Sequence, residues 1–318
     1  MAVAELTFGA GELAQPQEDS QLKVVWRRFR RHRLAVFGLG IASTLFAVAF
    51  LGPIFSPYDS TTIPRGPDYK RAVNLGPLAT WVDVRGQSHF HLLGTDESGR
   101  DYLTRLMQGG RVSLSLAITV TIIVTLLGLV IGCVSGYYGG WVDSLIMRVV
   151  DFILTLPALP IFLIIYTLVP QDQIPGGSFT VLVCIFIAFG WLGSARLARG
   201  MVLSLKNQEF TDASRAVGTP DGQIIVRHMI PNALAPVLVA ATLAVGGYVV
   251  AEASLSFLGF GVQPPAPSWG NMLRDVQGKL FNDPYEVFYP GLCIFSTSLS
   301  FNFIGDALRD ALDPRLKL

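Results

Sequence analysis

Charged residues are scarce in this chain. Only 15% of its 318 residues are charged, whereas 51% are hydrophobic and the mean hydropathy is +0.48; a soluble globular domain carries about 25% charged residues. Because the apolar residues come in long uncharged runs, the composition indicates a membrane protein. The net charge of +1 offers no basic field of the kind that attracts nucleic acid.

Cysteine is rare in the sequence, and a nucleotide-binding glycine loop is absent from it. The chain has three cysteines, Cys133, Cys184 and Cys293. Each lies in an apolar run without metal-ligand spacing, so we expect packing residues and no metal site. A P-loop requires a glycine, four residues and then Gly-Lys-Ser/Thr, but the only Gly-Lys pair, Gly278–Lys279, is followed by Leu280. The chain is therefore expected to be no ATPase and to bind no cofactor itself.

The first apolar run marks the start of the membrane part. Residues 1–24 are polar and predict a disordered cytoplasmic tail. Residues 25–55 predict an amphipathic segment and the first transmembrane helix, since Leu34 to Phe55 carries no charge and about 20 apolar residues cross a bilayer. Five arginines in WRRFRRHR (26–33) precede this run. By the positive-inside rule they place that end in the cytoplasm, on the membrane surface.

Five further apolar runs predict an all-helical protein with six spans and both termini in the cytoplasm. We expect an extracytoplasmic loop at 56–110, a transmembrane core at 111–306 and a cytoplasmic tail at 307–318. The runs predict helices at 113–136, 144–169, 179–197, 233–258 and 285–305. In the third helix, Pro157 and Pro160 predict kinks, and Arg148 and Asp151, three residues apart, predict an ion pair.

One polar segment, residues 207–231, interrupts the core on the cytoplasmic side. Its residues that are typical of helix ends and helix starts predict a helical hairpin. Gly218 suits the left-handed residue after a first helix, and Thr219 suits the cap of a second helix beginning at Pro220. Pro231 is expected to end that helix. The alternative is an ordinary solvated connector between two spans.

The spacing of residues in this hairpin resembles a known motif. The segment has Asp212-Ala213-Ser214, three residues, Gly218, nine residues and then His-Met-Ile-Pro, residues 228–231. This resembles the EAA loop of the membrane subunits of bacterial ABC importers. Three other stretches, 92–114, 256–273 and 302–315, resemble the C-type permease subunit of dipeptide, oligopeptide and nickel importers. The resemblance covers about residues 25–316.

The resemblance implies a type I ABC importer permease, found in the bacterial or archaeal cytoplasmic membrane. It implies partners: a paralogous permease, two ATP-binding subunits and an extracytoplasmic substrate-binding protein. It also implies short peptides as substrates. The hairpin would be the coupling helix that docks in a groove of the ATPase. The implied ATPase-coupling residues are Asp212, Ala213, Ser214, Arg215, Ala216, Gly218, Thr219 and Pro220.

Other candidate sites leave alternatives open. Glu252 lies late in the fifth predicted span, where it either lines the translocation path or serves as a hydrogen-bonded structural acid. His89 and His91 face one side of an extended segment, but without a nearby acid or cysteine they predict no metal site. Gly128 and Gly132 predict close helix packing.

Two other classes of protein compete with a permease subunit. An ion-driven secondary transporter or channel needs ionisable residues near the membrane midplane, whereas the charges here lie near the ends of the predicted helices. A membrane-embedded enzyme needs convergent polar groups at one depth, and the sequence suggests none.

Overall fold

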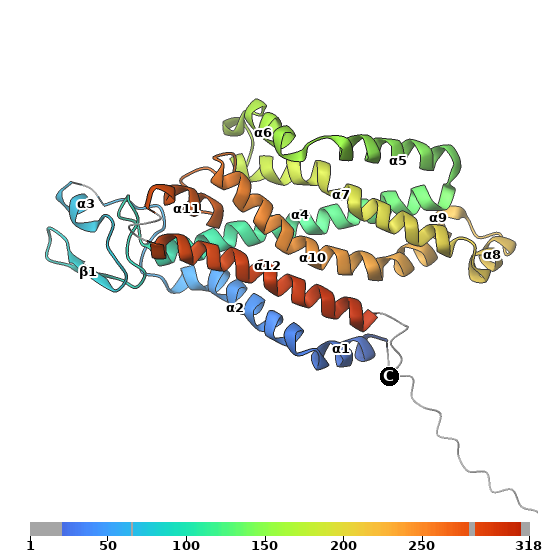
Figure 1. The fold of residues 1–318 in the computed structure, drawn as a ribbon, viewed down its shortest axis with the longest axis horizontal. Coiled ribbons are helices and arrows are strands. Elements are labelled where there is room, and N and C mark those ends of the chain that lie inside the picture. The colour runs from blue at the N-terminus through green and yellow to red at the C-terminus, as the bar shows by residue number, and fades with distance from the viewer. Residues whose placement is uncertain (1–20, 65, 280–283, 313–318) are drawn as a thin grey trace, which may run out of the picture.

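The fold is an elongated helical bundle. In this computed structural model, residues 21–64, 66–279 and 284–312 are described, so the predicted N-terminal tail lies almost wholly outside the described residues. The helices lie along one long axis, with α3 and β1 at one end and α8 at the other (Figure 1). The elements in chain order are α1 (Gln21–Arg31), α2 (Arg33–Phe55), α3 (Pro67–Ala72), β1 (Ala79–Val82), β2 (Ser88–His91), α4 (Tyr102–Tyr138), α5 (Gly140–Thr155), α6 (Ala158–Leu168), η1 (Gln171–Gln173), α7 (Gly177–Leu205), α8 (Glu209–Ala216), α9 (Asp221–Ile224), η2 (Ile225–Met229), α10 (Ile230–Phe257), α11 (Trp269–Asp275), η3 (Gln277–Lys279) and α12 (Pro284–Leu312).

The described helices include five that are long and apolar enough to cross a membrane. These are α2, α4, α7, the continuous α9–α10 and α12, and the bent pair α5–α6 makes a sixth when it counts as one span. This agrees with the six spans expected from the sequence. Two helices run well past their predicted ends: α7 runs to Leu205 and α12 to Leu312.

The predicted outer loop at 56–110 contains regular structure. It holds α3 and an antiparallel hairpin in which Trp81 of β1 lies opposite His89 of β2. It also includes the first turns of α4, which begins at Tyr102 and not near Ser113. The start is set by Asp101, whose carboxylate accepts hydrogen bonds from the N–H and the hydroxyl of Thr104 at 2.7 and 2.6 Å. Such a side-chain cap satisfies the free N–H groups of a first helical turn.

The core is centred on α4, which packs against α2, α7 and α10. Its 37 residues make a helix about 55 Å long. Gly128 and Gly132 lie against α7, and a Cβ on Gly132 would come within 2.3 Å of the carbonyl oxygen of Ala195. The close packing predicted for these two glycines is therefore confirmed. Helix backbones approach this closely only where side chains are small.

The third predicted span is broken in two. α5 and α6 meet at an angle of 89° at Pro157, because the residue before a proline avoids helical geometry and Leu156 is extended (ψ 136°). Pro160 adds no second kink, since it lies in the first turn of α6, where backbone N–H groups have no helical partner. The predicted pair of Arg148 with Asp151 is wrong. Asp151 pairs with Arg196 of α7, which runs beside α5.

The predicted helix end at Pro231 is also wrong. α9 continues through the π-helical turn η2 into α10, and the N–H of Ile230 bonds to the carbonyl of Ile225, five residues back. A wider turn leaves room for the proline ring, which in a regular α-helix clashes with the carbonyl four residues earlier. The side chain of Asn232 donates to the carbonyl of His228 at 2.6 Å, so this carbonyl is satisfied despite the irregular turn.

Candidate functional site

The polar segment forms a hairpin whose turn is a Schellman motif. α8 ends at Ala216, and Gly218 follows with a φ of +79°. The N–H of Gly218 donates to the carbonyl of Arg215 at 2.9 Å, and the N–H of Thr219 donates to that of Ser214 at 3.1 Å. These bonds satisfy carbonyls that the helix end leaves free. The left-handed conformation predicted for Gly218 is confirmed.

The second helix of the hairpin begins one residue later than predicted. Pro220 (φ −61°, ψ 143°) is the N-cap of α9, and Asp221 is its first helical residue. Thr219 is not the cap because its backbone belongs to the Schellman motif of α8. Asp221 still places a carboxylate in the first turn, where the positive end of the helix dipole favours it.

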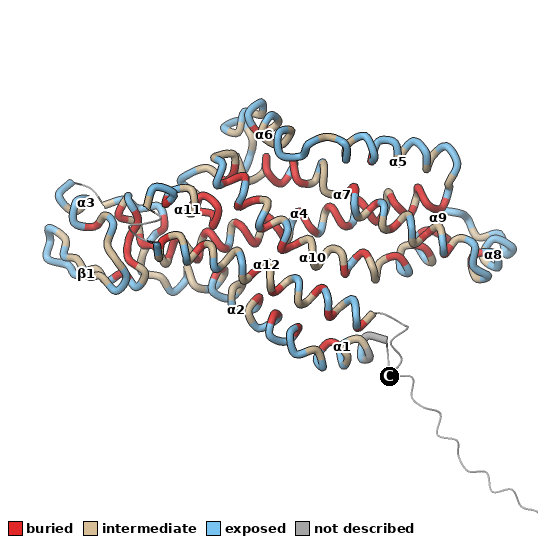
Figure 2. Tube along the Cα trace, viewed as in Figure 1, coloured by how far each residue is buried: buried red, intermediate tan, exposed pale blue. Residues whose placement is uncertain are grey.

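The outer face of α8 and its turn is open to solvent (Figure 2). Of the eight predicted coupling residues, six are exposed, and Ser214 and Thr219 are half-buried. The side chain of Asp212 is 69% exposed and lies 3.4 Å from Arg215. Val217, at the turn, is 83% exposed. The hairpin therefore presents small residues, one carboxylate and one apolar side chain at the tip of the bundle.

A tyrosine at the end of α4 holds both helices of the hairpin. Tyr137 is 6% exposed, and its hydroxyl donates to the carboxylate of Asp221 at 2.7 Å. The guanidinium carbon of Arg215 lies 5.3 Å from the centre of the Tyr137 ring, within the range of a cation–π contact. One α4 side chain thus contacts α8 and α9 together, so a displacement of the hairpin bears directly on the longest helix of the core.

A second set of contacts ties α8 to the π-helical turn. His228 of η2 lies beside Phe210, with ring centroids 5.8 Å apart, and its Nε2 is 3.5 Å from the hydroxyl of Ser214. On its other side α8 is tied to the end of α7: Thr211 is fully buried, and its hydroxyl donates to the carbonyl of Leu205 at 3.0 Å. π-helical turns often occur at functional sites, and this one lies where the hairpin becomes a membrane span.

Ion pairs brace the helices next to the hairpin. Nε and Nη2 of Arg199 both donate to the carboxylate of Asp143, the second at 2.6 Å. A two-point arginine–carboxylate pair fixes geometry as well as adding energy. It joins α5 to α7, six residues before α7 ends at Leu205.

Glu252 lies in a buried cluster of serines. It is fully buried, and it accepts hydrogen bonds from Ser113 of α4 at 2.8 Å and from Ser256 at 2.6 Å. The hydroxyl oxygen of Ser113 accepts in turn from the backbone N–H of Trp269 in α11, at 3.3 Å. These contacts favour the structural alternative, in which the acid joins α4, α10 and α11. A role in the translocation path stays a prediction.

Comparison with known proteins places the chain in a family. Residues 128–318 match the model of the binding-protein-dependent transport system inner membrane component, and residues 20–77 match the N-terminal transmembrane domain of oligopeptide transport permease C. The chain belongs to this family of transport permeases. It is thus a multi-pass membrane permease of the ABC importer type, a family that is not itself catalytic.

The permease has curated relatives along nearly its whole length. It is 35% identical to the oligopeptide transport system permease protein OppC of Bacillus subtilis, over 99% of this chain and 96% of the relative. It is 36% identical to the glutathione transport system permease protein GsiD of Escherichia coli O157:H7, over 92% and 90%. A dipeptide permease, DppC of Alkalihalophilus pseudofirmus, is 34% identical over 95% and 94%. A solved structure of the MetNI methionine ABC transporter aligns with a TM-score of 0.47 and 21% identity, over 65% of this chain and 96% of that chain.

Sequence reasoning missed Tyr137 and His228 as parts of the permease site. Tyr137 belongs to GYYGGWVD (136–143), a glycine-rich stretch at the end of the predicted span 113–136. A tyrosine at the end of an apolar span, in such a stretch, could have signalled a polar anchor, since a buried tyrosine hydroxyl normally finds a partner. Nothing in the sequence signals that this partner is Asp221, 84 residues later.

The histidine pair of the β1–β2 hairpin is engaged by protein groups. Trp81 donates its ring N–H to Nε2 of His91 at 3.1 Å, so Nδ1 carries the proton and donates to Asp101 at 2.8 Å. Burial alone would raise the pKa of the Asp101 carboxyl, but the hydrogen bonds from His91 and Thr104 lower it below its usual range. Both ring nitrogens of His91 thus have protein partners, and the Nδ1 bond holds Asp101, the N-cap of α4.

Proposed function

We propose that the permease is driven by separate ATPase subunits that dock on the α8–α9 hairpin. The proposal rests on one observation: the tip of the hairpin is exposed, whereas α4 holds its base. Asp212 and its small neighbours are open to solvent, whereas Tyr137 ties the hairpin to α4. A displacement of the tip by a partner is therefore transmitted to α4 through these side-chain contacts.

The proposed docking face consists of the residues that match the EAA pattern and the turn after them. Small side chains let a partner backbone approach closely, and an exposed carboxylate offers a charged hydrogen bond to a partner arginine or lysine. The proposed coupling residues are Asp212, Ala213, Ser214, Arg215, Ala216, Gly218, Thr219 and Pro220.

The proposed orientation places the hairpin and both termini in the cytoplasm. The arginine-rich α1 and the hairpin lie towards the same end of the bundle, whereas α3 and β1 lie at the other (Figure 1). Phe29 of α1 packs on Ala307 and Ala311 near the end of α12, so the two ends of the described chain meet on one side. The positive-inside rule assigns that side to the cytoplasm.

The proposed assembly contains a second, related permease, two ATPases and an extracytoplasmic binding protein, and it imports short peptides. The named relatives transport an oligopeptide, glutathione or a dipeptide, which are all peptides. Mass spectrometry of ligands retained by the co-purified binding protein tests the substrate class. Recovery of sugars or metal ions without peptide contradicts it.

A charge substitution tests the docking face. Asp212→Ala should weaken retention of the ATPase subunits on the purified permease about tenfold, the effect of losing one charged hydrogen bond. Asp212→Glu should retain them at least as well as the natural residue, because the longer acid matches the family pattern.

A matched control is Asp172→Ala. Asp172 is an exposed acid in η1, before α7, whereas Asp212 follows α7; the 29 residues of α7 separate the two by about 43 Å. The control should retain the ATPases fully. Equal retention by the two alanine variants would show that the ATPases dock elsewhere.

A further inference from the structure

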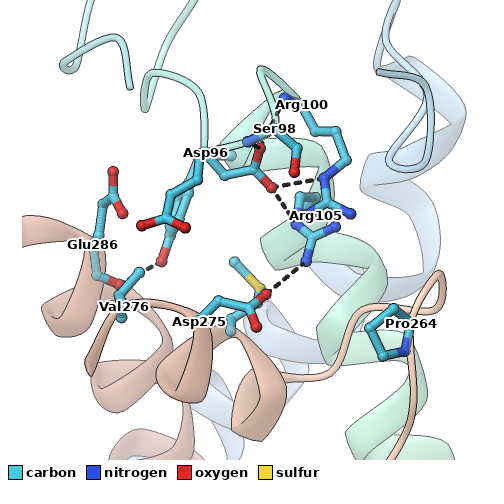
Figure 3. Close-up of a pocket in the computed structure, with 11 residues that line it drawn as sticks. Asp96, Ser98, Arg100, Arg105, Pro264, Asp275, Val276 and Glu286 are labelled. Atoms are coloured by element: carbon cyan, nitrogen blue, oxygen red, sulfur yellow. Dashed lines mark hydrogen bonds and ion pairs between the residues drawn. The ribbon is translucent and has the colours of Figure 1, made fainter. Parts of the chain in front are cut away.

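A cavity of about 330 Å³ is lined by the loop before α4, the first turns of α4, and α11 with the start of α12 (Figure 3). These elements lie at the end of the bundle opposite the hairpin (Figure 1). Arg105 in this lining and Tyr137 at the hairpin are 32 residues apart on α4, or about 48 Å. Small-molecule pockets start at about 300 Å³, so the volume suits a ligand of few atoms.

The cavity wall holds a buried donor that has no partner among the described residues. The side chain of Arg105 is 4% exposed; its Nε lies 3.2 Å from Asp96 and its Nη2 lies 3.6 Å from Asp275. No acceptor among the described residues bonds to its Nη1. Nη1 has almost no accessible surface, so a ligand oxygen reaches it only after the guanidinium turns toward the cavity. A buried donor without a partner costs about 1–3 kcal/mol, which favours this turn when an acceptor oxygen is present.

The same wall offers an acceptor whose partners are distant. The carboxylate of Asp275 is 3.6 Å from Arg105 and 3.9 Å from Arg274, beyond ordinary hydrogen-bond length. Burial raises the pKa of this carboxyl even though the two arginines oppose the shift. Asp275 would therefore be stabilised as a carboxylate by one more cationic donor.

The charges of the described residues around the cavity are balanced, which defines the ligand further. Among these residues there are four acids and four bases; Lys279 pairs with two of the lining carboxylates and Arg274 with a third. The acids are Asp96, Glu97, Asp275 and Glu286, and the bases are Arg100, Arg105, Arg274 and Lys279. A lone anion or cation would disturb this balance, whereas a ligand that carries both charges would not.

We propose that the cavity binds the zwitterion of an α-amino acid, with its carboxylate on Nη1 of Arg105 and its ammonium group on Asp275. The two protein groups are neighbours on one wall, as Figure 3 shows, and an α-amino acid carries its two charges on adjacent groups. This site goes beyond the proposed transport function, because it requires only the folded permease and neither ATPase docking nor import.

The test is calorimetric titration of the full chain in lipid nanodiscs, without nucleotide. L-alanine is the probe, and propionate and ethylamine each carry one of its two charges. L-alanine should bind at least about tenfold more tightly than either, since each single-charge probe loses one charged hydrogen bond. Equal affinity for propionate and L-alanine, or no saturable binding of L-alanine, overturns the proposal.

Two variants locate the site. Asp275→Asn should weaken L-alanine binding about tenfold and leave propionate binding unchanged; it is preferred to a change of Arg105, whose ion pairs also hold the loop. Asp83→Asn is the control. Asp83 directly follows β1 and lies outside the cavity lining, so this variant should bind L-alanine like the natural chain. Identical affinities of the two variants overturn the proposal. None of these outcomes depends on whether the hairpin binds an ATPase.

Discussion

The turn of the hairpin allows a sharp test, because the chain supplies two glycines that differ in one respect. A Cβ on Gly218 or on Gly222 would meet no heavy atom within 4 Å. Gly218 has a φ of +79°, whereas Gly222 lies in the helix α9. Replacing each by alanine therefore changes backbone strain without any steric clash.

The expected magnitudes follow from that difference. Gly218→Ala forces a residue with a Cβ into the left-handed conformation, at a cost of about 1–2 kcal/mol. Gly222→Ala is compatible with the helix, and it should be neutral or stabilise by up to about 1 kcal/mol. If ATPase binding requires the formed turn, Gly218→Ala lowers the apparent affinity about 5- to 30-fold, and Gly222→Ala does not.

Two quantities are measured: local hydrogen exchange and the retention of ATPase subunits. Hydrogen exchange of residues 209–224 should be faster in Gly218→Ala and unchanged or slower in Gly222→Ala, while the membrane spans exchange alike. ATPase retention on the purified permease should fall in the same order. Gly218→Asn should lie between Gly218→Ala and the natural chain, since asparagine tolerates the left-handed region. Indistinguishable exchange and retention in the two alanine variants would refute this reasoning.

Three further predictions concern the base of the α8–α9 hairpin, the core and the start of α4. Tyr137→Phe removes one hydroxyl bond to an exposed carboxylate, so it should cost about 1 kcal/mol of hairpin stability, measured by local hydrogen exchange, and should lower ATP-driven transport more than ATPase retention. Gly132→Ala places a Cβ 2.3 Å from an α7 carbonyl oxygen and should lower the melting temperature by an amount equivalent to about 1–3 kcal/mol, whereas Gly200→Ala in α7, with open space, should not. The lowered pKa of Asp101 stabilises the fold fully above its unfolded pKa of about 4, so the melting-temperature advantage of the natural chain over Asp101→Asn should shrink as pH falls below that value.

Sequence reasoning worked best where a single local rule applies. Apolar runs predicted the spans because crossing a bilayer requires about 20 apolar residues whatever the tertiary packing. Gly218 was predicted correctly because its left-handed conformation follows from the helix end alone. The small-residue spacing of Gly128 and Gly132 likewise predicted a close helix contact, though not that α7 is the partner.

The same reasoning failed where a distant segment decides the outcome. Asp151 was paired with Arg148 on its own helix, yet α7 brings Arg196 to it. Pro231 was expected to end a helix, but a π-helical turn absorbs the proline ring. The strands β1 and β2 were missed because their stability depends on contacts around His91 and Asp101, which an isolated hairpin of four-residue strands lacks.

The sequence by itself determined the membrane class, the approximate spans, the hairpin turn and the permease family, since hydropathy, glycine conformation and motif spacing are local properties of the chain. Only the tertiary structure decided that Tyr137 holds both helices of the hairpin, that Glu252 is enclosed by serines, and that Arg105 and Asp275 share one cavity. Each of these depends on residues far apart in the chain, and the packing of α4 against α7, α10 and α11 brings them within hydrogen-bond or ion-pair range.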